Sequence, residues 1–117
     1  MTKVQITTGT SSLVASLDDS AASRDFIKLL PLTVTLDDFH QTEKIVVLPE
    51  ALSTDGAASG YSPRKGDIAY YKPWGNLAIF YKDFGHSAGL IRLGHIDNNL
   101  QVLSQSGSLD VTIELID

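Results

Sequence analysis

The chain has 117 residues and a mass of 12.6 kDa, the size of one domain, so we expect a single domain over residues 1–117. Hydrophobic residues make up 43% and charged residues 20%, a globular composition that argues against disorder. The absence of cysteine excludes disulfides, thiolate nucleophiles and cysteine-based zinc sites. The net charge of −5 argues against nucleic-acid partners and against docking on anionic membranes.

Targeting and membrane-spanning patterns are not seen in the sequence. The longest apolar runs, such as residues 77–81, fall far short of the roughly 18 residues that a membrane-spanning helix needs. Residues 1–6 lack the basic head and apolar stretch of a signal peptide. We therefore expect a cytoplasmic protein without a membrane partner.

The chain begins with a hairpin pattern. Apolar residues alternate over 4–8 and again over 13–17, with a turn at Gly9-Thr10 between them. Side chains two residues apart share one face of a strand, so we expect a hairpin with one buried face.

A change of period marks a helix over residues 20–30, where apolar side chains recur at helical spacing. Asp18, Asp19 and Ser20 offer N-cap oxygens, and Pro31 ends the helix because it has no amide hydrogen. We expect this short amphipathic helix to cover one end of a barrel.

The rest of the chain is predominantly strand-like. Further strands are expected over 32–36, 44–48, 67–72, 77–82, 90–96 and 111–115. Turns or loops are expected over 37–42, 50–65, 73–76 and 83–89, and a second short helix over 98–105. Eight short strands without βαβ alternation favour a mainly β fold, a closed eight-stranded barrel with one or two short helices, because closure leaves no exposed sheet edge.

Three segments carry a family resemblance: GDIAYYKPWGNLAIFYKD at 66–83, LLPLTVTL at 29–36 and LGHI at 93–96. With Leu48-Pro49, they resemble the small bacterial and archaeal cyclophilin-like proteins, in the right order over nearly the whole chain. The resemblance implies a compact eight-stranded barrel with a helix capping one end, a reduced relative of the cyclophilin barrel.

The same resemblance does not bring the isomerase motif with it. True cyclophilins carry a phenylalanine-histidine-arginine run whose arginine polarises the proline nitrogen. Here Phe39-His40 is followed by Gln41, in a predicted polar turn. Whether the protein is an enzyme therefore stays open.

Aromatic and basic residues gather in the middle of the chain. Seven of the nine aromatic residues lie between 61 and 84, and residues 61–92 carry five basic and two acidic side chains, whereas the flanking parts are both acidic. Such a segment suits a planar or anionic ligand, and equally a barrel core with lysines on its rim. In the pairs Tyr70-Tyr71 and Phe80-Tyr81 one ring points in and the other out, so some rings are exposed or lie under a covering element.

Seven residues are predicted to bind a ligand, and Trp74, at a turn tip, is the first choice among them: Tyr61, Arg64, Trp74, Phe80, Phe84, His86 and Arg92. No metal or other cofactor is expected, since His40, His86 and His95 lack the short spacings of a metal site.

Three functions are consistent with these patterns. The leading hypothesis is a binding module for a peptide or small molecule, with a groove formed by the loop end 61–65, strands 67–72 and 77–82, and the turn 83–89. The alternative is a peptidyl-prolyl cis-trans isomerase with a non-standard active site. The third is a homo-oligomeric building block, because an exposed aromatic patch often marks a partner surface.

Overall fold

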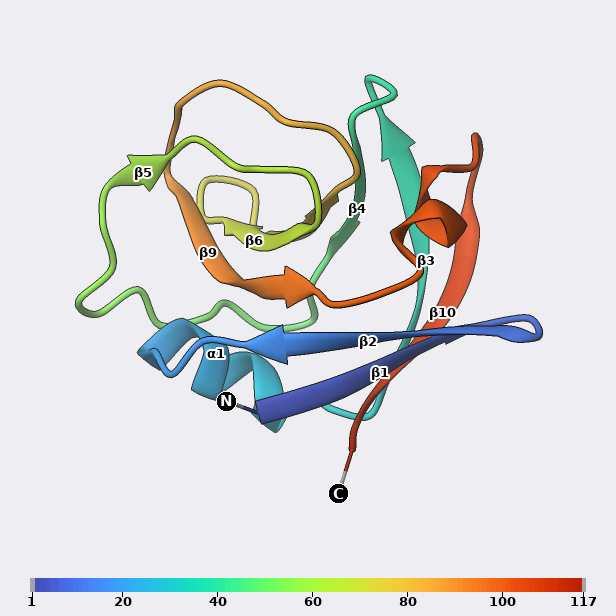
Figure 1. The fold of residues 1–117 in the computed structure, drawn as a ribbon. Coiled ribbons are helices and arrows are strands. Elements are labelled where there is room, and N and C mark those ends of the chain that lie inside the picture. The colour runs from blue at the N-terminus through green and yellow to red at the C-terminus, as the bar shows by residue number, and fades with distance from the viewer. Residues whose placement is uncertain (1, 117) are drawn as a thin grey trace.

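Eight antiparallel strands of the computed structural model, which describes residues 2–116, close into a barrel (Figure 1). Around the barrel they follow the order β1-β10-β3-β4-β7-β6-β9-β2. The strands are β1 (Thr2–Thr8), β2 (Ser11–Leu17), β3 (Leu32–Phe39), β4 (Glu43–Val47), β6 (Asp67–Tyr71), β7 (Asn76–Phe80), β9 (Leu90–Ile96) and β10 (Leu109–Leu115). The predicted closed eight-stranded, mainly β fold is confirmed.

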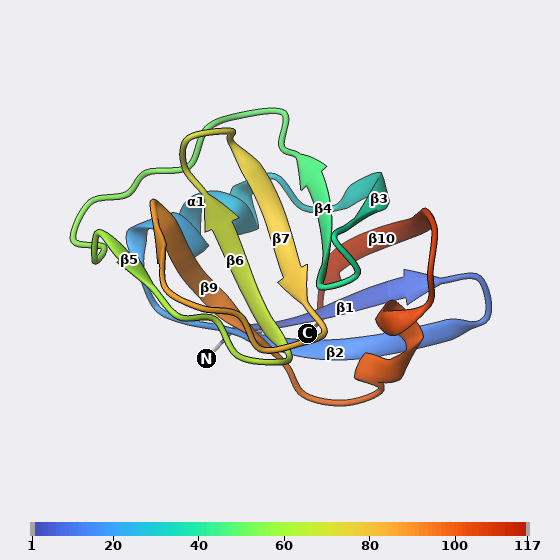
Figure 2. The same cartoon turned by 90° about the horizontal axis from the view of Figure 1, so that it is seen from above.

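A two-stranded ribbon lies outside the barrel wall, formed by β5 (Gly60–Tyr61) and β8 (Ser87–Ala88). These residues fall in the segments 50–65 and 83–89, which the sequence predicts as loop and turn. The ribbon needs glycine at position 60, because a Cβ there would lie 2.4 Å from the Ser87 carbonyl oxygen. β5 packs against β9, so the ribbon adds a partial second layer to one side of the barrel (Figure 2).

The two helices, α1 (Ala21–Lys28) and η1 (Leu100–Ser104), lie near opposite ends of β4 (Figure 2). At one end the Asp25 carboxylate on α1 accepts a hydrogen bond from the Ser53 N–H, beyond the end of β4. At the other end Lys44, near the start of β4, donates to carbonyls that follow η1. Helix α1 covers the barrel as predicted, but it is shorter than 20–30, because Ser20 is the N-cap and the last turn stops before Pro31.

Alternation places the core as predicted. In the first hairpin Val4, Ile6 and Leu13 are at most 1% exposed. Strand β7 differs because both of its faces are buried: Leu77 and Ile79 point into the main core, while Ala78 and Phe80 belong to a second apolar cluster on the outer side of the wall. That second cluster lies where the ring-rich segment meets the ribbon.

Strand β3 is longer than the sequence suggests. Asp37, Asp38 and Phe39 were expected in a turn but pair with Ile45, Lys44 and Glu43. The turn is confined to the following residues, where His40 and Gln41 adopt positive φ angles of 53°. The extra length brings Phe39 beside Glu43 on the wall.

Candidate functional site

The aromatic side chains of β6 and β7 lie in two places, the main core and the outer face of the barrel wall. Tyr70 points into the main core and is 2% exposed, whereas Tyr71 packs against the outer cluster. Phe80 also belongs to the outer cluster but is only 1% exposed, because Phe84 stacks on it and Tyr61 packs against the same cluster. The ring-rich segment therefore contributes to the core and also to the outer surface of the barrel.

A cleft of about 240 Å³ opens on this outer surface, between the wall strands β4, β6 and β7 and the segment 84–90. Half of its ten lining residues are aromatic: Phe39, Tyr71, Trp74, Phe80 and Phe84. The remaining lining consists of apolar Ile45 and Leu90 and polar Glu43, Asn76 and Ser87. We refer to this site as the aromatic cleft.

Trp74 forms the rim of the aromatic cleft. Its ring lies edge-on to Tyr71, with centroids 5.3 Å apart, and edge-on to Phe39 at 6.1 Å. On the other side Phe84 stacks on Phe80 at 6.2 Å. Trp74 remains 59% exposed and Phe84 49% exposed, so two large rings flank an open cleft. Such rings offer stacking surface to a ligand.

The turn under Trp74 is held rigidly. The Gly75 N–H donates to the Tyr71 carbonyl at 2.9 Å, and the Lys72 N–H donates to the Gly89 carbonyl at 2.9 Å. Gly89 has a φ of +81°, and a Cβ there would lie 2.9 Å from Cδ of Pro73. The segment 84–90 thus packs directly on the Trp74 turn, and this contact keeps the two sides of the cleft together.

One end of the aromatic cleft contains an unpaired polar atom. Asn76 is 3% exposed, and its Nδ2 donates to the Leu77 carbonyl at 3.1 Å. Because that carbonyl can only accept, the other amide atom is the oxygen, and Asn76 Oδ1 has no hydrogen-bond partner. Among residues 2–116 it is the one buried side-chain nitrogen or oxygen left unpaired. A buried acceptor without a donor costs about 1–3 kcal/mol, which a ligand N–H or O–H would recover.

The other end carries Glu43. This carboxyl is half-buried, and burial raises the pKa of Glu43 to about 7. Within the described part of the chain its carboxylate takes part in no ion pair and no side-chain hydrogen bond. A carboxylate in apolar surroundings without a cation is unfavourable, so it favours a positively charged or hydrogen-bond-donating partner.

A larger cavity of about 490 Å³ lies on the far side of the ribbon. It is bordered by the start of α1, the loop residues 55–58 and the side chains of Tyr61, Ile91 and Arg92. We refer to it as the charged cavity, because Asp19, Arg24, Asp55 and Arg92 contribute to its lining.

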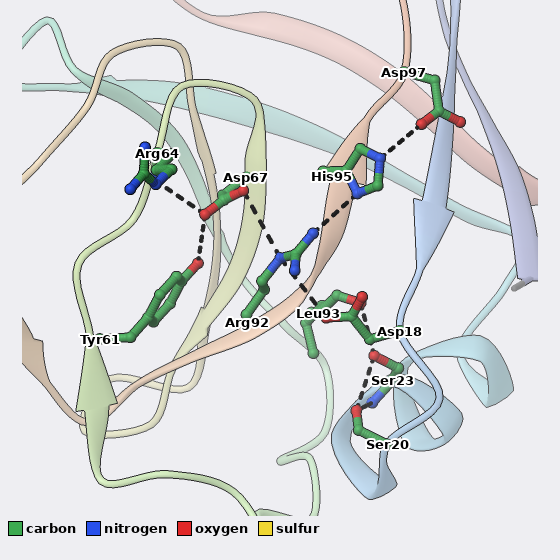
Figure 3. A network of polar contacts seen from close by, with 10 residues as sticks. All are labelled: Asp18, Ser20, Ser23, Tyr61, Arg64, Asp67, Arg92, Leu93, His95 and Asp97. Carbon is green, nitrogen blue, oxygen red and sulfur yellow. Dashed lines mark hydrogen bonds and ion pairs between the residues drawn. The ribbon is translucent and has the colours of Figure 1, made fainter.

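A network of paired groups underlies the charged cavity (Figure 3). Asp67 accepts from the Tyr61 hydroxyl at 3.2 Å and from the Arg64 backbone N–H at 3.0 Å. Burial, together with the Asp67 carboxylate, raises the pKa of Tyr61 far above its ordinary value. Arg92 Nε lies 3.8 Å from Asp67 and 3.7 Å from Asp18.

The network continues from Arg92 along β9. An Arg92 guanidinium nitrogen lies 3.0 Å from His95 Nδ1, and His95 Nε2 lies 3.0 Å from Asp97 (Figure 3). Asp97 also accepts from Ser16 and Lys3. Each charged group in this chain of contacts has a partner within the protein.

The structure divides the seven predicted ligand-binding residues between these two places. Trp74, Phe80 and Phe84 line the aromatic cleft, while Tyr61 and Arg92 line the charged cavity. Two further residues line neither site: exposed Arg64, whose backbone joins the Asp67 network, and exposed His86. The predicted residues thus lie in two adjacent pockets, which share Leu90, and not in the one groove expected from the sequence.

Seven of the ten residues that line the aromatic cleft were not among the predicted ligand-binding residues: Phe39, Glu43, Ile45, Tyr71, Asn76, Ser87 and Leu90. A signal for Glu43 was present, because it alternates with Ile45 and Val47 and so shares a face with them. For Asn76 there was none, since a residue after Pro73-Trp74-Gly75 is equally typical of a turn.

Residues 2–116 contain neither a metal-binding cluster nor a membrane-spanning helix. No group of three histidine, aspartate or glutamate side chains is placed to hold a metal ion. No helix in this part of the chain is long and apolar enough to cross a membrane.

Comparisons with known proteins place the chain in context. The sequence model described as the Cyclophilin-like family matches residues 6–114. The solution structure of a hypothetical protein from Archaeoglobus fulgidus superposes with a TM-score of 0.69, covering 98% of this chain and 95% of that one, at 16% sequence identity. At that identity the likeness concerns the fold alone. The search of curated proteins returned no match.

Proposed function

The chain belongs to the cyclophilin-like family, and from this premise we propose that it is a binding module that takes a peptide or small molecule into the aromatic cleft. The observation that carries the proposal is the buried, unpaired Asn76 Oδ1 in a cleft whose rim is formed by exposed rings. A protein gains nothing in stability from such an atom, so a donor supplied by a ligand is its natural partner.

The shape and chemistry of the cleft support a short or flat ligand. Its volume of about 240 Å³ is that of a small pocket, and its rings suit stacking or an apolar side chain. An extended peptide brings backbone N–H donors, which are the kind of partner that Asn76 Oδ1 lacks. The cleft lies on a rigid wall, and its two sides are joined by the Gly89–Pro73 contact, so little ordering is needed on binding.

The test uses Trp74, the only tryptophan of the chain, as a built-in reporter. A set of indole, amine and amide fragments and of capped tetrapeptides is titrated while Trp74 fluorescence and backbone amide NMR shifts are recorded. We expect shifts that cluster on β4, β7 and residues 84–90. The Trp74→Ala variant should fold normally and weaken the best binder more than tenfold, read by NMR. Shifts that cluster elsewhere, or an unchanged affinity in the variant, would overturn the assignment of the cleft.

An isomerase remains the second candidate because Arg92 lines a cavity beside the Tyr61 ring. Prolyl isomerisation needs a cation or donor aimed at the imide nitrogen, against a barrier of about 18–20 kcal/mol. Arg92 has two carboxylates within 3.8 Å, so its charge already has partners. The assay is isomerisation of a proline peptide by the wild type, Arg92→Ala and Arg64→Ala. Acceleration that depends on Arg92 would support the enzyme, and a wild type without activity would exclude it.

A further inference from the structure

Three side chains that line the aromatic cleft, Glu43, Asn76 and Ser87, offer oxygen acceptors, and no lysine, arginine or histidine lines it. The strand register sets their spacing along the wall. Glu43 on β4 pairs with Phe80 on β7, and Phe80 and Asn76 lie four residues apart along β7. Glu43 and Asn76 are therefore separated by roughly 13 Å along the strand direction. The cleft therefore has an acceptor at each end and aromatic rings between them.

The position of the nearby cations strengthens this pattern. The basic residues that make 61–92 a positive segment are Arg64, Lys65, Lys72, Lys82 and Arg92. All five are exposed and none lines the cleft. The sequence suggested an anionic ligand on account of these residues. The lining of the cleft favours a ligand of the opposite charge.

Aromatic rings favour cations as well. The face of a tryptophan or tyrosine ring attracts an ammonium or guanidinium group, by about 0.5–1 kcal/mol at exposed sites and by more when water is excluded. Trp74 and Tyr71 meet edge to face, and the Trp74 ring is largely exposed at the rim. The methylene stem of lysine or arginine can pack on such rings while its charged end reaches a carboxylate.

We propose that the aromatic cleft recognises the protonated side chain of a lysine or arginine within an extended peptide. Glu43 is the counter-ion, the rings of Phe39 and Trp74 flank the stem, and Asn76 Oδ1 accepts a backbone N–H of the same peptide. This inference rests on the proposed function and adds its ligand class. The chain's net charge of −5 favours the approach of a basic peptide over an acidic one.

The experiment compares capped pentapeptides that differ only at the central residue: lysine, its neutral analogue norleucine, acetyl-lysine and glutamate. Affinities are measured by Trp74 fluorescence and amide NMR shifts. We expect the lysine peptide to bind at least tenfold more tightly than the norleucine peptide, with a preference that weakens as salt is added. Glu43→Gln should abolish the preference, because it removes the charge and keeps the shape.

Two variants make the result specific. Glu114→Gln, an exposed residue on β10, causes the same change in net charge far from the cleft and should keep the lysine preference. Asn76→Leu should weaken the lysine and norleucine peptides alike, because both present the same backbone N–H.

The failure of this inference differs from the failure of the proposed function. Equal binding of lysine and norleucine at the cleft, or tighter binding of glutamate, would overturn the cationic ligand while leaving a ligand-binding cleft in place. Peptides and fragments that all leave the cleft resonances unmoved would overturn the proposed function itself.

Discussion

The aromatic cleft and the charged cavity lie on the same side of the barrel but differ in size and in how their polar groups are paired. The charged cavity is the larger, at about 490 Å³ against 240 Å³, yet both arginines of its lining, Arg24 and Arg92, already pair with carboxylates of the protein. The cleft is smaller, but Asn76 Oδ1 and the Glu43 carboxylate have no partner there. Cavity size alone would select the charged cavity, whereas the unpaired polar groups select the aromatic cleft, which is the site that we propose. Unpaired polar groups are the better indicator, because folding alone gives no reason to keep them.

The largest effect on stability is expected from a substitution of Asp67, the centre of the network beside the charged cavity. Asp67→Ala leaves the half-buried Tyr61 hydroxyl without its acceptor and removes one carboxylate beside Arg92. We expect the free energy of unfolding to fall by about 2–3 kcal/mol, measured by urea denaturation followed by circular dichroism. Affinity at the cleft should stay within twofold, because the cleft and this network share no lining residue.

Tyr61→Phe is the matched control, since it removes the hydroxyl and keeps the ring. It should lower the free energy of unfolding by only about 1 kcal/mol. If Asp67→Ala proves as stable as the wild type, the network does not hold the ribbon to the wall, and the structural role given to it is wrong.

The cleft should respond to pH in the region where Glu43 titrates. Burial raises the pKa of Glu43 from 4.5 to about 7, so the unfolded chain loses this proton at lower pH than the folded one. The contribution of Glu43 to the free energy of unfolding is therefore complete below pH 4.5 and is lost as pH rises through 7, by on the order of 2–3 kcal/mol. Glu43→Gln should remove this slope, and the difference between the two denaturation curves against pH measures it.

The other groups with shifted pKa values titrate outside the range from pH 4.5 to 7. The pKa values of Asp25, Asp38 and Asp97 are lowered, so these carboxylates act in the opposite sense, below pH 4. Burial and the Asp38 carboxylate raise the pKa of Tyr81 to about 12, and the charge of Glu43 adds to this rise. A slope that persists in Glu43→Gln would show that the carboxyl in the cleft is not its source.

The fold could be predicted from the sequence because its signals are local. Alternation over 4–8 and 13–17 placed the first hairpin, and the change of period followed by Pro31 placed α1. The ribbon β5–β8 could not be found in this way. Its two-residue strands are too short to show alternation, and its pairing depends on a close backbone approach at Gly60.

The candidate site was only partly predictable, for a different reason. Strand β7 is buried on both faces, so alternation cannot tell which of its residues faces the main core. The register of β4 with β7 puts Glu43 and Asn76 on the same face of the wall, which no local pattern reveals. The basic character of residues 61–92 does not extend to the aromatic cleft, because the cations of that segment lie outside the cleft lining.

A smaller change in stability is expected at Asn76. Asn76→Leu removes the unpaired Oδ1 and keeps similar volume, at the loss of one hydrogen bond to the Leu77 carbonyl. The free energy of unfolding should change by less than about 1 kcal/mol, whereas most buried substitutions cost more. Thermal and urea denaturation give this value. A loss above about 2 kcal/mol would mean that Asn76 is held for the fold and not for a ligand.

The smallest effect is expected for Arg92→Ala, and it separates the two regions most cleanly. The Arg92 side chain is 41% exposed, and its carboxylate partners lie 3.7 and 3.8 Å away. Exposed ion pairs of this kind contribute about 0–1 kcal/mol, so the variant should fold almost as the wild type does. Its affinity for the lysine pentapeptide should change less than twofold, measured by Trp74 fluorescence. A tenfold loss would show that the cleft and the charged cavity act as one site, because a side chain absent from the cleft lining would then be needed for binding there.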